Sequence, residues 1–218
     1  KYSVESRGFS VDITKEDQIT ENANILESIF GKIDALVNNA ANNPKVENSD
    51  GKNFSRLENF PLDVWRKDIS VGLTGAFLCS KHYGTKISEN PNGVVILNIS
   101  SDLGLIAPDQ RLYRKIGLRH EEQPVKPITY SVIKSGLLGL TRYLATYWPE
   151  KVRCNAICPG GVEAGQPKEF LIEVSNSIPL GRLAQPDEYK GTLIYLLSDS
   201  SSYMNGAVTS VDGGRTCW

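Results

Sequence analysis

The sequence has no excess of charge of either sign. Its 24 lysines and arginines are matched by 25 aspartates and glutamates in a chain of 218 residues, so the formal net charge is −1. Proteins that bind nucleic acid or an anionic membrane surface usually carry a clear basic excess, and we expect neither partner here. The sequence also contains no apolar run long enough to cross a bilayer as a helix.

Cysteine and histidine are scarce, with four and two residues. Cys79, Cys154, Cys158 and Cys217 do not form the close pairs of a zinc site, and no histidine has a metal-ligating neighbour at helical spacing, so no metal site is predicted. Cys154 and Cys158 lie in an apolar run, where cysteine usually acts as a small core residue. Free buried thiols are typical of a reducing compartment, which predicts a cytoplasmic location.

Short apolar runs alternate with longer amphipathic segments along the chain. This alternation is typical of βαβ units around a parallel sheet, so the sequence predicts an α/β fold in one domain spanning residues 1–218. Thr14 is expected to cap the first helix, and Gly31 is expected to end it. The predicted strands are 8–13, 34–38, 94–99, 152–158 and 207–211, and the predicted helices are 14–30, 61–87, 128–147 and 186–197.

The predicted helix 128–147 carries Tyr130 and Lys134 four residues apart. Residues at this spacing share one helical face, and a lysine ammonium beside a phenol favours the phenolate. A tyrosine tuned in this way can exchange a proton near neutral pH. The pair alone is weak evidence, because an ordinary amphipathic helix can carry both residues.

Other motifs surround this pair in a fixed order. With them, the chain resembles the short-chain dehydrogenase/reductase family from about Asp12 to Gly214, which implies a single-domain, Rossmann-like, doubly wound parallel sheet with helices on both faces. The motifs are Asp12-Ile13-Thr14, the stretch from Gly31 to Ala40, Asn98-Ile99-Ser100-Ser101, Tyr130 with Lys134, Asn155 to Gly160, Pro179-Leu180-Gly181-Arg182, and the stretch from Ser198 to Gly214.

The resemblance implies an NAD(P)-dependent oxidoreductase that interconverts a secondary alcohol and a ketone on a small-molecule substrate. Tyr130 would be the general acid/base, and Lys134 would lower its pKa and bind the nicotinamide ribose. Ser101 would polarise the substrate carbonyl as a neutral donor aimed at developing charge. Ser100 is the weaker candidate of the serine pair.

The resemblance also implies a site for NAD or NADP. Asn38 and Ala40 would line the groove near the adenosine half, Asp12 would contact the adenine, and Val162 would contact the nicotinamide amide through its backbone. Two alternatives stay open: Asn38 can belong to a turn-forming asparagine pair, and Asp12 can be a helix N-terminal acid. The full expected cofactor set is Asp12, Asn38, Ala40, Tyr130, Lys134, Pro159, Gly160 and Val162.

The sequence departs from the family pattern at four places, of which three concern the cofactor site and the proton relay. No Gly-x-x-x-Gly-x-Gly loop precedes Asp12, so we expect the domain to be N-terminally incomplete, with its first strands and its pyrophosphate-binding loop missing. Gly72 stands where the family usually has an asparagine that helps to hold a water in the proton relay. Ala41 stands where the family usually has glycine.

A charged stretch, 108–127, separates Ser101 from Tyr130 more widely than is usual in the family. It is either a solvated surface loop or a specificity loop whose cations meet an anionic substrate such as a sugar phosphate or a nucleotide sugar. The side chains noted in it are Arg111, Tyr113, Arg114, Lys115, Arg119 and His120.

Family members commonly assemble through long helices, so a homodimer or homotetramer is expected on helices 61–88 and 128–147, which carry Trp65, Phe77 and Leu137-Leu138. The competing hypothesis is a non-catalytic binding or scaffold protein that keeps the fold, favoured by Gly72 and the missing glycine-rich loop. A third is an isomerase or dehydratase that uses a bound cofactor transiently.

Overall fold

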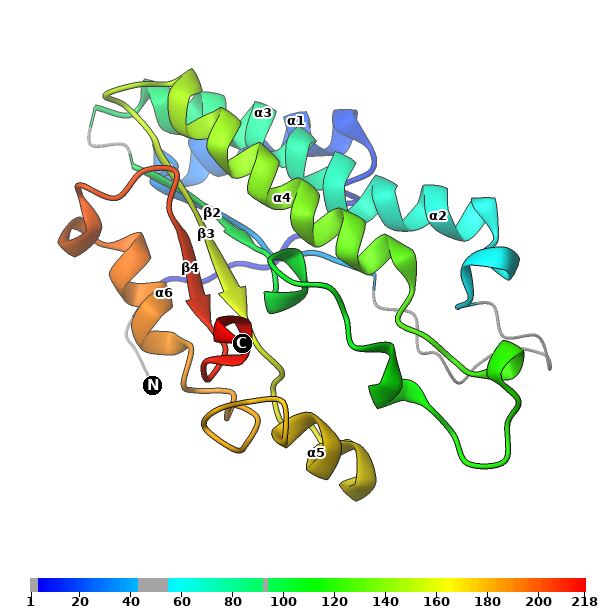
Figure 1. Cartoon of the computed structure of the whole chain (residues 1–218). Helices are drawn as coiled ribbons and strands as arrows, with labels where there is room; N and C mark the ends of the chain where they lie inside the picture. Colours follow the sequence, from blue (N-terminus) through cyan, green and yellow to red (C-terminus); the bar gives the residue numbers. More distant parts are fainter. Residues whose placement is uncertain (1–3, 43–54, 92–93) are drawn as a thin grey trace.

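Four parallel strands form the centre of the molecule (Figure 1). The computed structural model describes residues 4–42, 55–91 and 94–218, so most of the predicted 42–59 loop and part of the turn at 91–93 lie outside the described residues. Neighbouring strands pair in the order β1-β2-β3-β4, which confirms the predicted parallel α/β sheet. The strands are β1 (Ala35–Asn38), β2 (Val95–Ile99), β3 (Arg153–Pro159) and β4 (Val208–Val211).

Helices cover both faces of this sheet, as predicted (Figure 1). Side chains alternate between the faces of a strand, so Ile96 of β2 packs with α3 and α4, while its neighbour Leu97 packs with α6. The helices are α1 (Glu16–Phe30), α2 (Leu62–Ile69), α3 (Gly75–Glu89), α4 (Ile128–Tyr147), α5 (Lys168–Ser175) and α6 (Lys190–Leu197). A π-helical turn, Ser70–Thr74, joins α2 to α3.

Two of the predicted elements near the start of the chain are wrong. Residues 8–13 form no strand; instead Val11 and Ile13 pack against the apolar cluster that α1 shares with α3. Thr14 does not cap α1, because its amide and its hydroxyl both donate to Asp12 Oδ1, at 2.9 and 2.7 Å. The helix therefore begins one residue later, after Lys15.

Other boundaries follow the sequence more closely. Gly31 ends α1 with φ of +74°, a left-handed conformation that glycine adopts without steric cost. Helix α4 begins and ends where it was predicted. Helix α6 begins later than Pro186, because the amides of Glu188 and Lys190 bond back to nearby carbonyls in turns. Helix α5 was not predicted.

The two leucines offered as part of a subunit interface are core residues. Leu137 and Leu138 are 3% and 4% exposed, and they pack between α4 and its neighbours. The expectation that they face a partner subunit is wrong, because Leu137 packs against α3 and the π-helical turn, while Leu138 packs against the sheet. Phe77, by contrast, is 50% exposed on α3.

Buried amide and hydroxyl groups tie the sheet to its covering helices. Asn98 of β2 is fully buried, accepts a hydrogen bond from Asn38 Nδ2 at 2.8 Å and donates one to Thr141 Oγ1 of α4 at 2.8 Å. Asn38 also donates to Ser80 Oγ of α3 at 3.0 Å. Each buried polar group in this network has a partner, so its desolvation is offset.

Within the described ranges, no helix combines the length and apolar character that a membrane crossing requires. Those residues also contain no group of histidine, cysteine, aspartate and glutamate side chains that could hold a metal ion.

The four thiols differ sharply in exposure, which makes the packing testable. Cys79, Cys154 and Cys158 are buried, and burial raises the pKa of Cys79 to about 11 and that of Cys154 to about 12. Cys217 is exposed. Because the thiolate is the reactive form, we expect a disulfide reagent such as Ellman's to modify one thiol per native chain and all four in denaturant.

The Cys217→Ser variant should then show no fast-reacting thiol. Fast reaction of more than one thiol per native wild-type chain would contradict the packing described here.

Candidate active site

Five of the predicted site residues lie at one edge of the sheet. Parallel strands end at the same edge, and this is where open α/β sheets bind ligands. Asn38 ends β1, Ser101 follows β2, and Pro159 ends β3. The first turns of α4 bring Tyr130 and Lys134 to the end of β2.

Ser101, Tyr130 and Lys134 are close together, as the resemblance implied. The Tyr130 hydroxyl donates to Ser101 Oγ at 3.2 Å. Lys134 Nζ donates to the main-chain carbonyl of Ile99 at 2.8 Å and lies 5.8 Å from the centroid of the Tyr130 ring. The arrangement places a phenol, a hydroxyl and an ammonium around one small volume.

Ser100 has a structural task that separates it from Ser101. Its hydroxyl donates to the main-chain carbonyl of Lys134 at 2.7 Å, so it joins β2 to α4. Gly104 permits this contact: a Cβ there would lie 2.6 Å from Ser100 Oγ and 2.9 Å from the Lys134 carbonyl oxygen. Ser100 is therefore engaged in packing, and Ser101 is the serine that reaches Tyr130.

The start of α4 is joined to β2 by Ser100, and it is also joined to α2. Thr129 Oγ1 donates to Asp68 Oδ2 at 2.6 Å, and both side chains are buried. A hydrogen bond to a charged acceptor is stronger than one between neutral groups. This contact joins α2 to the residue that precedes Tyr130, so it helps to fix the position of the phenol.

The expected lowering of the Tyr130 pKa by Lys134 is not seen. The pKa of Tyr130 is raised, because burial disfavours the phenolate more than the hydrogen bond with Ser101 favours it. Burial also lowers the pKa of Lys134 to about 8. The phenol therefore holds its proton at neutral pH.

Two of the residues expected to bind the cofactor, Asn38 and Asp12, use their side chains in hydrogen bonds within the protein. The side chain of Asn38 turns into the buried amide network, so a cofactor contact there would have to come from its backbone. The Asp12 carboxylate holds Thr14, and this lowers the Asp12 pKa through the Thr14 backbone and side-chain hydrogen bonds. Ala40 lies in the turn after β1.

At the end of β3, the chain passes close to the turn after β4. A Cβ on Gly160 would lie 2.8 Å from the Cα of Asp212, so the missing side chain permits this close approach. The carbonyl of Val162 accepts a hydrogen bond from Gln166 Nε2 at 2.7 Å. One lone pair of the Val162 carbonyl is thus used within the chain, whereas its N–H group donates to no other group among the described residues.

A small pocket opens beside Tyr130 and is bordered by a lysine that sequence reasoning missed. Lys126 Nζ lies 3.9 Å from the centroid of the Tyr130 ring, a cation–π distance. Burial lowers the pKa of Lys126, and it has no ion-pair partner among the described residues. The residues that line the pocket are Ala41, Asn42, Lys126, Pro127, Thr129, Tyr130, Ile133 and Lys134.

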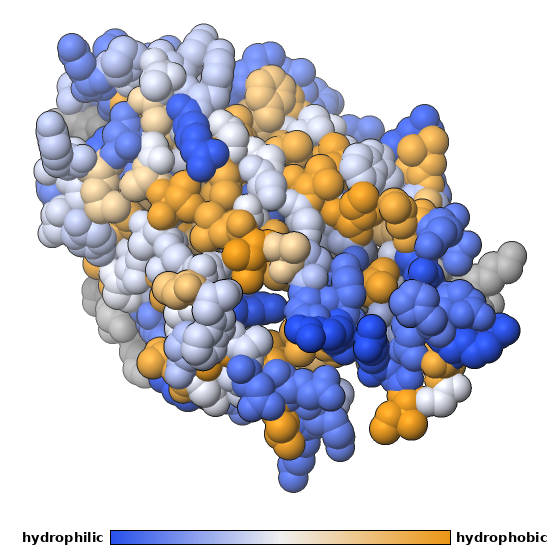
Figure 2. Space-filling model, viewed as in Figure 1, coloured by the Kyte–Doolittle hydropathy of each residue, from blue (hydrophilic) through white to orange (hydrophobic). Residues whose placement is uncertain are grey.

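Two of the cations that were noted in the 108–127 stretch form ion pairs within the stretch itself. Arg111 pairs with Asp109 at 2.7 Å, and Arg119 pairs with Glu122 at 2.8 Å. Figure 2 shows a largely hydrophilic surface over this part of the molecule. The Tyr113 ring lies 6.2 Å from that of Phe170 on α5. Lys126, near the end of the stretch, is the cation that reaches the pocket.

Gly72 lies where a side chain cannot be accommodated without movement. It belongs to the π-helical turn, and a Cβ there would lie 2.8 Å from Ile133 Cγ2 on α4. Ile133 therefore occupies space next to the position where the family usually has asparagine.

We expect Gly72→Ala to destabilise the fold by about 1–3 kcal/mol through overpacking, measured as a drop in denaturant midpoint. Gly139→Ala is the matched control, because Gly139 is an exposed α4 residue with nothing within 4 Å of its Cβ position. That control should be neutral or slightly stabilising, since alanine favours a helix. Equal stability of Gly72→Ala and wild type would show that Ile133 does not restrict this site.

Comparison with families of known proteins gives two matches that together cover most of the chain. Residues 1–113 match the model described as short chain dehydrogenase. Residues 117–216 match the model described as enoyl-(acyl carrier protein) reductase.

Individual relatives agree with these matches. The cis-4-hydroxycyclohexanecarboxylate dehydrogenase of Sinomonas cyclohexanicum is 32% identical over 94% of this chain and 74% of its own length. An NADP-dependent mannitol dehydrogenase of Hypocrea jecorina is 30% identical over 99% of this chain and 74% of its own. Among solved structures, a gluconate 5-dehydrogenase from Burkholderia cenocepacia, in complex with NADP and tartrate, aligns with a TM-score of 0.79 at 25% identity and covers 95% of this chain and 74% of its own.

Proposed function

This chain belongs to the short-chain dehydrogenase/reductase family and is an NAD(P)-dependent oxidoreductase, and we propose that it interconverts a secondary alcohol and a ketone at Ser101 and Tyr130. The observation that carries this proposal is the contact between the Tyr130 hydroxyl and Ser101 Oγ at the carboxyl end of β2. Membership of a family of oxidoreductases, together with the contact between Tyr130 and Ser101, favours the enzyme over the scaffold hypothesis.

In the direction of reduction, Tyr130 would give its proton to the substrate oxygen as that oxygen gains charge. Tyr130 is protonated at neutral pH, so it can supply the proton, and the developing charge on the substrate oxygen is what draws the proton from the phenol. Ser101 would donate a hydrogen bond to the same oxygen and stabilise its charge. In the direction of oxidation, Tyr130 would have to lose its proton first, so a positive charge at Lys134 matters most there.

The residues around Lys134 fit the nicotinamide ribose. An ammonium group has three donors, and one of them is used by the carbonyl of Ile99. The remaining donors lie beside the pocket that Ala41 and Asn42 border, as contact with ribose hydroxyls requires. When bound, the nicotinamide cofactor supplies or accepts the hydride.

Replacing Tyr130 with phenylalanine tests this assignment. We expect Tyr130→Phe to lower kcat by about 10²–10⁴-fold, because the proton donor is removed, while the fold is kept. The measurement is the change in nicotinamide absorbance with NAD or NADP on a panel of mannitol, gluconate and cis-4-hydroxycyclohexanecarboxylate, which relatives are named for. Turnover without net change in nicotinamide absorbance would favour the isomerase or dehydratase hypothesis.

Tyr143→Phe is the matched control, because Tyr143 is a 62% exposed residue on the same helix. It should keep the wild-type rate. A Tyr130→Phe enzyme that is folded and as fast as wild type would contradict the proposed role.

We propose further that the preferred substrate carries a negative charge. Lys126 borders the pocket beside the Tyr130 ring and is partly desolvated. Among the described residues it forms no ion pair, and the Asp102 carboxylate acts on it from beyond ion-pair distance. A buried cation is stabilised when an anion binds near it. A hydroxy acid meets this requirement, and the sugar phosphate or nucleotide sugar expected from the sequence belongs to the same anionic class.

This second proposal predicts a charge-dependent defect. We expect Lys126→Met to lower kcat/KM for cis-4-hydroxycyclohexanecarboxylate by about 10–100-fold, since a hydrogen bond to a charged group contributes ~1.5–3 kcal/mol. The same substitution should change kcat/KM for the uncharged primary amide of that substrate by less than about threefold, because no charge is then recognised.

Lys115→Met is the control, as Lys115 is an exposed lysine of the same stretch. Equal losses on the acid and the amide, or a rise in the KM of the cofactor alone, would contradict substrate recognition by Lys126.

The homodimer or homotetramer expected from the sequence stays a prediction. The exposed side chains available for it on the helical face are Phe77, Tyr143 and Tyr147, on α3 and α4. Figure 2 shows apolar residues gathered over the α4 side of the molecule. Oligomerisation through these helices would cover them.

A further inference from the structure

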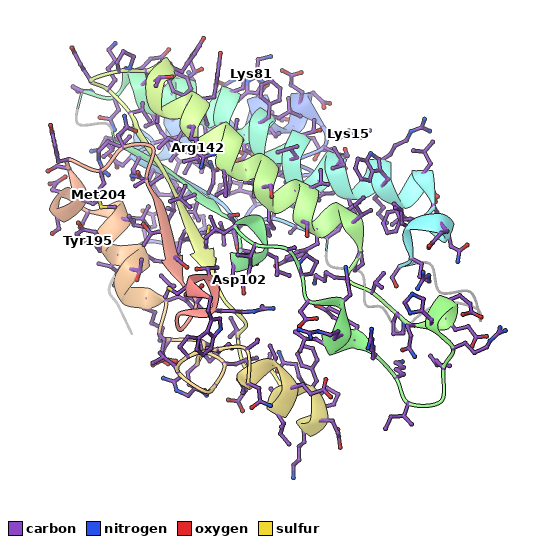
Figure 3. All side chains as sticks on the ribbon, in the orientation of Figure 1. Lys15, Lys81, Asp102, Arg142, Tyr195 and Met204 are labelled. Atoms are coloured by element: carbon purple, nitrogen blue, oxygen red, sulfur yellow. The ribbon has the colours of Figure 1, made fainter. Side chains whose placement is uncertain are left out.

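The C-terminal segment is joined to the catalytic serine by a buried ion pair. Arg215 Nη1 donates to Asp102 Oδ2 at 2.7 Å, and the two side chains are only 10% and 4% exposed. Asp102 directly follows Ser101, whereas Arg215 belongs to the last turn of the chain. In Figure 3, Asp102 lies beside this C-terminal turn.

The turn that presents Arg215 is itself held in place. Asp212 accepts hydrogen bonds from the amides of Gly214 and Thr216, at 3.0 and 2.8 Å. Trp218 Nε1 donates to the carbonyl of Ser177 at 3.1 Å. Fixed at both sides, the turn aims the guanidinium of Arg215 at Asp102 without a flexible segment between them.

The other oxygen of Asp102 accepts the proton of the catalytic serine. Ser101 Oγ donates to Asp102 Oδ1 at 2.8 Å, while Tyr130 donates to Ser101 Oγ at 3.2 Å. The hydrogen bonds therefore run from Tyr130 to Ser101 to Asp102, and Arg215 donates to the far side of the carboxylate. To polarise a substrate oxygen, Ser101 must turn this same proton away from Asp102.

The strength with which Asp102 holds the proton therefore sets the cost of that rotation. A carboxylate is a strong acceptor for a hydroxyl, and a guanidinium bound to its other oxygen draws negative charge away from Ser101. We propose that Arg215 is a positioning residue that acts through Asp102 on Ser101. It weakens the hydrogen bond from Ser101 to the carboxylate, so that the serine proton can turn to the substrate.

A set of charge-neutralising variants tests this inference, which rests on the proposed function. Arg215→Gln leaves the Asp102 charge uncompensated, so we expect kcat to fall at least tenfold while the KM of the substrate changes little. The double variant D102N/R215Q removes both charges but keeps an amide oxygen to accept from Ser101. It should recover kcat to within about threefold of wild type.

One control variant and one comparison separate this role from simple anchoring of the C-terminus. Arg142→Gln changes an exposed arginine on α4, labelled in Figure 3, and should leave kcat unchanged. A purely structural ion pair would give the same kcat for every variant that stays folded. It would also make the double variant no better than Arg215→Gln.

If Arg215→Gln does not fold, because a buried charge is left unpaired, the double variant D102N/R215Q still decides, since it leaves neither charge unpaired. An amide oxygen holds the serine proton less tightly than a carboxylate, so the kcat of the double variant should lie within about threefold of wild type. A tenfold loss of kcat in the folded double variant would overturn the inference.

A readout that needs no substrate keeps the test separate from the proposed function. With tyrosines labelled with ¹³C at Cζ, the Tyr130 signal, assigned by its absence in Tyr130→Phe, should move in Arg215→Gln and return towards its wild-type position in D102N/R215Q. An unmoved signal in Arg215→Gln would overturn the inference. Absence of turnover on the panel by wild type, with the signal moving as expected, would count against the proposed function alone.

Discussion

The hydrogen bond from Ser100 to the main chain of Lys134 fixes how far α4 lies from the end of β2, and the geometry of the site depends on that distance. Only a residue without a side chain at position 104 lets the short turn after Ser101 press against α4. With α4 held there, Tyr130 reaches Ser101 and Lys134 reaches the carbonyl of Ile99. The reactive groups thus come from rigid elements, which hold geometry better than loops do.

The same region concentrates buried polar groups that would be costly if any lost its partner. Asn98 connects the strands to α4 through Thr141, and Asp68 connects α2 to the start of α4 through Thr129. Among the described residues, no buried side-chain nitrogen or oxygen lacks a hydrogen-bond partner. A low-dielectric surrounding strengthens such bonds and penalises unmet ones, so these networks favour one arrangement of the sheet and helices.

Local sequence patterns predicted the elements that depend on nearby residues. The apolar periodicity of 128–147 placed α4 correctly, and Gly31 ended α1 because its left-handed backbone is a local property. The four-residue spacing of Tyr130 and Lys134 is also a local property, and it puts both side chains on one face of α4, at the site. The strand expected at 8–13 failed because a strand needs a partner, and Val11 and Ile13 pack on helices instead.

What the sequence could not predict depends on the folded surroundings. Asp102 and Arg215 are 113 positions apart, so no local pattern connects them. The Tyr130 pKa was expected to fall because a lysine was near in sequence, yet burial, which only the fold decides, raises it. Lys126 stands four residues before Tyr130, and that spacing was the one available signal for its position over the ring.

The position of Trp218 has a practical consequence for handling the protein. Trp218 is only three positions beyond Arg215, and its indole N–H donates to the carbonyl of Ser177. A purification tag fused directly after Trp218 would lie next to the turn that supports the buried ion pair and would disturb its contacts. An affinity tag at the opposite end of the chain, or one placed here behind a flexible glycine-serine spacer, would leave that turn undisturbed.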